Sequence, residues 1–234
     1  MNITEEIDRA TVLCQELEDI IVKRQQFPNG YREKLLTAHW ALIFDYDKSI
    51  LCLLRNKFYG GAFALLRPLV EALVRAHVVI CGNEEAVCEI RHDEYRTNFK
   101  AVGKELDKAF NTEKLFDNYL NGMAGVLHSF THSGLSQLIR RFKKNDLDAN
   151  YADAEIYELI HHITSAVWMV TNLITRSFKF EDEAAKCQEL YMAWRQSRDR
   201  LSLTQLPKTC SDAFLLAVIC RFHKRFHLCM IRLK

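Results

Sequence analysis

Residues that interrupt helices are scarce along this chain. Its 234 residues include only 8 glycines and 3 prolines, well under the usual share. A fold of many short strands needs such turn residues at close intervals, so their scarcity argues against a β-sandwich or barrel. Long helices remain, and we expect an all-α fold.

Apolar residues recur along most of the chain at three- and four-residue spacing, which is the period of an amphipathic helix. We expect these to pack as a single up-and-down bundle of about seven to nine helices. The segment 62–81 is apolar nearly all the way round, which is typical of a central, buried helix. The longer predicted helices span Ile3 to Ile21, Tyr31 to about Phe58, Ala62 to Cys81, Glu84 to Phe110, Asp153 to Ile174 and Glu181 to Arg200.

Positive charge is concentrated at the end of the sequence. The formal net charge is +2, yet residues 221–234 carry five lysines or arginines and no acid, so the rest of the chain is slightly acidic. We therefore divide the chain into a helical bundle, 1–205, and a basic amphipathic helix or tail, 206–234. The tail either contacts a membrane, nucleic acid or a partner helix, caps the core or a dimer interface, or is a dispensable terminus.

The eight cysteines form no C-x-x-C pair, so zinc-ribbon and thioredoxin-like sites are not expected. The first residues lack the basic and apolar regions of a signal peptide. The longest apolar run, Ala213–Cys220, is far shorter than the roughly 20 residues that span a bilayer. We expect a reduced, cytoplasmic protein without a transmembrane segment.

Three charged residues, Arg67, Glu71 and Arg75, lie four apart in the apolar segment 62–81 and so share one helix stripe. In one interpretation they form a structural ion network, because Glu71 can pair with either arginine. In the other, the surplus arginine binds an anion such as a phosphate. Pro68 disfavours helical geometry at Arg67, which places that residue at a kink or a helix start.

The segment Leu127–Gly134 carries two histidines, His128 and His132, at four-residue spacing. As metal ligands they lack a third partner, and no glutamate follows the first histidine, so no metal or cofactor is expected. They are candidates for a general acid and base, with the Ser129 and Thr131 hydroxyls holding a substrate. The alternative is that these polar side chains satisfy one another in the core.

Two arginines, Arg140 and Arg141, begin a short basic cluster not far along the chain from the histidines. Cations at a helix end complement the helix dipole. The same cluster could steer an anionic ligand towards the histidine segment.

The run Gly60–Ala72, with Leu127–Gly134, resembles uncharacterised bacterial helical proteins that carry an "LLRPL-x-EA" helix and an "HS-aromatic-THGG" turn. The resemblance covers about residues 40–175. The chain is more distantly similar to the HEPN superfamily of helical bundles, many of which are metal-independent ribonucleases of toxin–antitoxin or phage-defence systems. Those members carry an arginine followed, after four to six residues, by a histidine. Here the arginine and the histidine would come from separate helices.

This resemblance implies an effector of a toxin–antitoxin or phage-defence system that cleaves RNA without a metal ion, binds RNA or a nucleotide, and acts with a partner protein of that system. We also expect a homodimer that forms through a helical face. A histidine would activate the ribose 2′-OH, an arginine would stabilise the transition state, and Glu71 would orient the arginine. The alternative is a non-catalytic binding or scaffold subunit of a defence or regulatory complex. The predicted catalytic residues are Arg67, Glu71, Arg75, His128 and His132, and the predicted substrate-binding residues are Ser129, Thr131, Arg140 and Arg141.

Overall fold

The computed structural model describes residues 2–24, 27–110 and 150–202, with a few positions between 114 and 147. Seven α-helices lie in these parts of the chain, so the predicted all-α bundle is confirmed. Residues 142–143 and 146–147 add a minimal antiparallel pair, β1 (Phe142–Lys143) and β2 (Asp146–Leu147). The helices are α1 (Ile3–Val22), α2 (Tyr31–Arg55), α3 (Tyr59–Cys81), α4 (Glu84–Arg91), α5 (Phe99–Phe110), α8 (Asp153–Ser177) and α9 (Glu181–Ser202).

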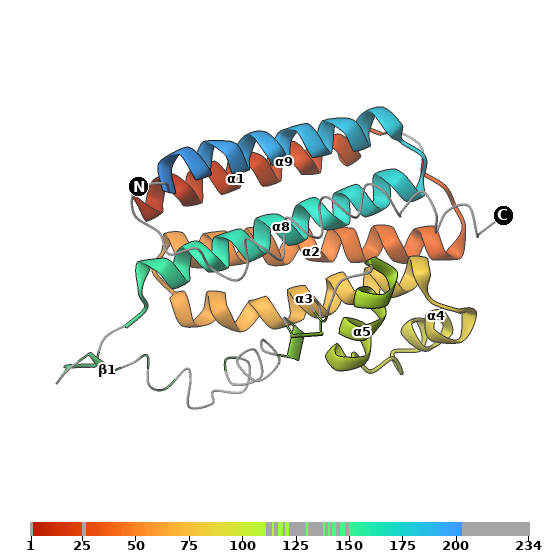
Figure 1. Cartoon of the computed structure of the whole chain (residues 1–234), viewed down its shortest axis with the longest axis horizontal. Helices are drawn as coiled ribbons and strands as arrows, with labels where there is room; N and C mark the ends of the chain where they lie inside the picture. The colour runs from red at the N-terminus through yellow and green to blue at the C-terminus, as the bar shows by residue number, and fades with distance from the viewer. Residues whose placement is uncertain are drawn as a thin grey trace.

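The five long helices run alongside one another (Figure 1). Successive helices α1, α2 and α3 alternate in direction, as do α8 and α9, which is the up-and-down arrangement that short connections favour. In contrast, α3 and α8 run in the same direction, because α8 begins at the end of the bundle where α3 also begins. The shorter α4 and α5 lie beside the C-terminal half of α3.

The central helix is α8, which packs against α1, α2, α3 and α9. Its sequence looks amphipathic because it contains serines and threonines, yet many of these are buried. Their hydroxyls donate to carbonyls one turn earlier, as Thr164 does to Ile160 O at 2.9 Å and Thr171 to Val167 O at 2.8 Å. Buried hydroxyls satisfied in this way carry little penalty. The prediction that residues 62–81 form the central helix is therefore corrected, since α3 lies to one side of α8.

Pro68 lies inside α3 and does not mark its start. The helix begins at Tyr59, two turns before Arg67, so the alternative of a helix start at Arg67 is wrong. Proline removes one backbone hydrogen bond, but the neighbouring Leu66 and Leu69 are buried in the core. Their packing offsets the lost bond.

The predicted single helix from Glu84 to Phe110 is two helices. α4 ends at Arg91, and Asp93 adopts a left-handed conformation with φ of 57°, which Asp tolerates better than most residues. The apolar seam explains the break, because no aliphatic residue follows Ile90 until after Phe99. Apart from Tyr95, which packs against the core, residues 92–98 have no apolar side chain to bury by continuing the helix.

The core consists of two clusters that meet along the bundle. One gathers around Trp40, Trp168 and Trp194, and the other around Leu69 and Ile163. Helices α2, α3 and α8 contribute side chains to both clusters. The five cysteines in the described ranges are all free thiols, and among those ranges no helix has the length and apolarity to cross a membrane. The predicted tail, 206–234, lies outside the described residues.

Candidate functional site

Of the three predicted charges on α3, two form a pair. The Arg67 Nε donates to the Glu71 Oε1 at 2.8 Å, as the four-residue spacing allows. About a quarter of the Arg67 side chain is exposed and somewhat more of Glu71. Glu71 therefore fixes the plane of the Arg67 guanidinium at a position that solvent and solutes can reach.

Arg75 binds the loop after α4 rather than Glu71. Its Nη1 lies 3.6 Å from the Asp93 Oδ1, and its Nη2 donates to the Tyr95 carbonyl at 3.3 Å. The buried Nε has no hydrogen-bond partner among the described residues. With desolvation, the nearby Arg75 charge lowers the pKa of His39 on α2 to about 4. Arg75 thus holds the α4–α5 loop against α3.

Arg140 lies in an ion pair with Glu155, in the first turn of α8. Its Nη1 donates to the Glu155 Oε2 at 2.5 Å. The guanidinium also lies over the rings of Tyr151, at 5.3 Å, and Phe130, at 5.7 Å. Arg140 therefore joins the chain before α8 to the start of that helix.

Four aromatic rings beside this ion pair were not predicted as site residues. Phe63 stacks on Phe130 with ring centroids 5.1 Å apart, and on Tyr151 at 5.2 Å, while Tyr59 lies 5.6 Å from Tyr151. Tyr59 and Phe63 occupy the same four-residue spacing as Arg67 and Glu71. One stripe of α3 therefore begins with aromatic rings and continues with charges, and the spacing alone could have revealed it.

The remaining predicted site residues cannot be placed. His128, Ser129, Thr131, His132 and Arg141 lie outside the described residues, whereas Phe130, between the two histidines in sequence, is described. Among the described parts of the chain, no three possible metal ligands converge.

A buried polar pair that the sequence did not predict lies elsewhere, between α1 and α2. The Cys14 thiol donates to the Asp47 Oδ1 at 3.5 Å, and the Asp47 side chain is almost completely buried. Burial raises the pKa of Asp47 to about 7 and raises the pKa of the Cys14 thiol. The polar stripe of α3 contributes nothing to this pair.

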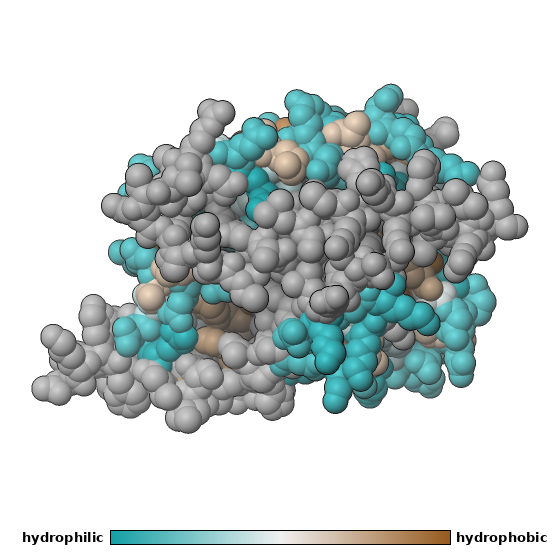
Figure 2. Space-filling model, in the orientation of Figure 1, coloured by the Kyte–Doolittle hydropathy of each residue, from teal (hydrophilic) through white to brown (hydrophobic). Residues whose placement is uncertain are grey.

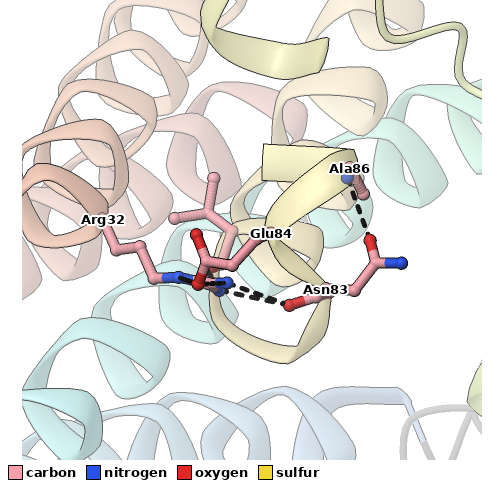
Figure 3. A network of polar contacts seen from close by, with 6 residues as sticks. Arg32, Asn83, Glu84 and Ala86 are labelled. Carbon is pink, nitrogen blue, oxygen red and sulfur yellow. Dashed lines mark hydrogen bonds and ion pairs between the residues drawn. The ribbon is translucent and has the colours of Figure 1, made fainter. Parts of the chain in front are cut away.

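At the C-terminal end of α3, polar contacts join this helix to α2 and α4 (Figure 3). Arg32 of α2 donates to the Val79 carbonyl at 2.7 Å and to the Glu84 Oε1 at 2.6 Å. Asn83 caps α4, since its Oδ1 accepts from the Ala86 N–H at 2.9 Å. The hydrogen bonds of Arg32 therefore join α2 to the C-terminal end of α3 and to the start of α4.

A family model described as a family of unknown function (DUF6988) matches residues 40–197. This span begins within α2 and ends within α9, so it covers most of the described bundle. No curated protein and no solved structure matches the chain.

Proposed function

The chain belongs to the family of unknown function DUF6988, and we propose that it binds and cleaves RNA without a metal ion. The proposed site is the α3 stripe around Arg67 and Glu71 together with His128 and His132. Its proposed setting is a toxin–antitoxin or phage-defence system in the cytoplasm, which rests on the distant resemblance to HEPN bundles.

The stacking of Phe130 on Phe63 carries this proposal. Phe63 precedes Arg67 by one turn of α3, and Phe130 lies two residues from each histidine. The position of Phe130 beside Phe63 supports a site that draws an arginine from α3 and a histidine from the segment around Phe130.

The Arg67–Glu71 pair supports the same site. A guanidinium presents five donors in a planar fork, and Glu71 accepts from Nε and so sets the orientation of the fork. An oriented, partly desolvated arginine is suited to stabilise the charge that develops on a phosphate in the transition state. We propose that Arg67 contacts the phosphate and that Glu71 is its positioning residue.

In the proposed reaction, one histidine takes the proton of a ribose 2′-OH as general base. The 2′-oxygen then bonds to the adjacent phosphorus while the bond from phosphorus to the 5′-oxygen breaks. The other histidine protonates the leaving 5′-oxygen. The products are a 2′,3′-cyclic phosphate and a 5′-OH end, so the reaction needs no co-reactant.

The aromatic side chains beside the stripe suit RNA as a ligand. Single-stranded nucleic acids are commonly bound by aromatic rings that stack on bases and by cations that contact phosphates. Tyr59 and Tyr151 are half-buried, and Arg140 lies over Tyr151. Ser129, Thr131 and Arg141 are proposed to complete this substrate-binding surface.

The test is cleavage of total RNA by the purified full-length protein in excess EDTA. The wild type should produce 2′,3′-cyclic phosphate ends, and the double variant His128→Ala/His132→Ala should be inactive. Arg67→Gln should reduce cleavage at least 100-fold, because an oriented charge on the transition state is lost. Arg96→Gln is the matched control, since Arg96 is an exposed arginine on the α4–α5 loop, and it should retain full activity.

Equal background cleavage by the wild type and the double histidine variant would overturn the ribonuclease proposal. Light scattering of the same preparation checks the proposed homodimer, which should have twice the mass of the 27.3 kDa chain. Cell fractionation checks the cytoplasmic location.

The second candidate is a non-catalytic binding or scaffold subunit of a defence or regulatory complex. The engagement of Arg75 with Asp93 and of Arg140 with Glu155 favours it, because both arginines already hold parts of the fold together. In this case a fluorescein-labelled single-stranded RNA would bind to the wild type without being cleaved, and Arg67→Gln would weaken its binding. A protein that neither binds nor cleaves this RNA would exclude RNA as the ligand of both candidates.

A further inference from the structure

A groove of about 420 Å3 runs between α1 and α9. Its apolar surface is formed by Val12 and Leu13 of α1 with Leu190 and Trp194 of α9, and Asp8 and Glu16 line it as well. Val12 is 59% exposed, which is unusual for a large aliphatic side chain beside a buried tryptophan. In Figure 2 apolar atoms lie among hydrophilic ones along the upper edge of the molecule, over these two helices.

The negative charge of α1 favours a positively charged occupant of this groove. The helix carries six acidic residues and a single arginine, Arg9. Asp8 is paired with Arg55 at 2.6 Å, whereas Glu16 is exposed and forms no ion pair with any residue in the described ranges. An occupant with an apolar face and basic residues would match both the surface and the charge.

The described chain ends beside this groove. Arg9, near the start of α1, donates to Ser197 near the end of α9, and Arg24, just after α1, pairs with Glu183 at the start of α9. The two helices are therefore antiparallel, and α9 ends next to the beginning of α1 (Figure 1). Ser197 lines the groove only five residues before α9 ends, at Ser202.

We propose that the C-terminal segment 206–234 of the same chain docks in this groove as a helix. The segment carries six basic residues and one acid, opposite in sign to α1. As a helix its 29 residues would be about 44 Å long, enough to follow the roughly 30 Å of α1. Pro207 is suited to the turn that separates this helix from α9.

The register of the docked helix follows from equal rise per residue. A helix that starts after Pro207, level with Ile3, runs in the same direction as α1. It places the apolar run Ala213–Cys220 alongside residues 8–15, where Val12 is exposed. The basic residues Arg221 and Lys224 then lie level with Glu16 and Asp19. The order of apolar and basic residues in the tail thus matches the order of apolar and acidic positions on this face.

Hydrogen exchange of the full-length protein tests the docking. Amides of residues 209–230 should exchange at least tenfold more slowly than in an unstructured peptide. Val12→Asp should abolish this protection, because it buries a charge under the apolar run. Leu42→Asp, at a similarly exposed leucine on α2, is the matched control and should leave the tail protected. An unprotected tail in the wild type, or equal protection in all three proteins, would overturn the proposal.

Zero-length carbodiimide cross-linking tests the register and the identity of the occupant. The proposal requires a cross-link within one chain from Lys224 to Asp19, which is level with it, or to Glu16 one turn earlier, and the double variant Glu16→Gln/Asp19→Asn should remove it. A mixture of 14N- and 15N-labelled protein separates the occupants, since mixed-isotope cross-linked peptides mean that the tail of a second copy fills the groove and overturn the proposal. Tail protection that develops only after RNA is added would overturn it in favour of a nucleic-acid contact.

Discussion

Asp47 is a carboxyl group in an environment that disfavours its charge. Its Oδ1 accepts from the Cys14 thiol, its Oδ2 has no hydrogen-bond partner among the described residues, and the side chain is 1% exposed. Burial is the main reason that its pKa rises to about 7. Asp47 lies three or four residues from the buried Ile43, Phe44 and Ile50, whereas Asp45 is exposed. The helical spacing therefore indicates that Asp47 is buried, but only the packing of α1 against α2 brings Cys14 beside it.

A pH titration of stability tests the state of Asp47. The folded protein binds an extra proton between the ordinary pKa near 4 and the raised value near 7, so the carboxyl lowers the free energy of unfolding as pH rises through this window. The free energy of unfolding of Asp47→Asn, relative to that of wild type, should therefore increase by up to about 1.4 kcal/mol per pH unit between pH 4 and 7. Urea unfolding at several pH values measures it.

The comparison with wild type removes the effect of two half-buried histidines, His39 and His77. Burial lowers the pKa of His39 and His77 to about 4, so they add stability as pH rises towards 6.5, equally in both proteins. Asp45→Asn is the matched control and should show no such pH-dependent difference. A difference between Asp47→Asn and wild type that stays constant from pH 4 to 8 would contradict the account.

At the scale of elements, most helix limits follow from capping residues and apolar spacing. Gly82 and Asn83 separate α3 from α4, in the gap between the predicted helices Ala62 to Cys81 and Glu84 to Phe110, and the Asn83 side chain caps α4. The break between α4 and α5 was readable too, since the seam lacks aliphatic residues between Ile90 and Phe99 and Asn98 caps α5. The sequence does not show which side of α3 faces α8, because that depends on which helices pack against each other.

The cap of α4 gives a prediction at this scale. Asn83→Ala should cost about 1 kcal/mol of local stability, because the Ala86 N–H loses its acceptor. Amides of α4 should then exchange about fivefold faster, while those of α5 stay unchanged. Asn98→Ala removes the equivalent bond to Ala101 and should have the opposite pattern. Equal acceleration of both helices in either variant would contradict local capping.

At the scale of the whole molecule, each of the two core clusters contains side chains from α2, α3 and α8. All three tryptophans belong to one cluster, around Trp168, whereas Leu69 belongs to the other. Tyr46 and Leu73 pack against both clusters. This continuity indicates that the bundle unfolds as one cooperative unit.

Tryptophan fluorescence can therefore test the coupling between the clusters. Leu69→Ala leaves a cavity in the cluster that lacks tryptophan and should lower the free energy of unfolding by about 2–5 kcal/mol. The fluorescence transition in urea should shift together with the helical circular dichroism. Leu17→Ala, in the tryptophan cluster, should produce a shift of the same order by both measurements. A fluorescence midpoint that Leu69→Ala leaves unchanged would show two independent units.

The sequence predicts most of the helices, because the spacing of apolar residues and the scarcity of glycine and proline are local properties that favour long helices. It also placed Arg67 and Glu71 on one stripe, because spacing along a helix fixes a shared face. Packing between helices settles the rest: Arg75 binds Asp93 and Tyr95, which leaves Glu71 to pair with Arg67, and α8 takes the central position. Glu71 lies four residues from both arginines, so spacing along the helix does not choose between them, and the contacts of Arg75 and of α8 join residues that are distant in the sequence.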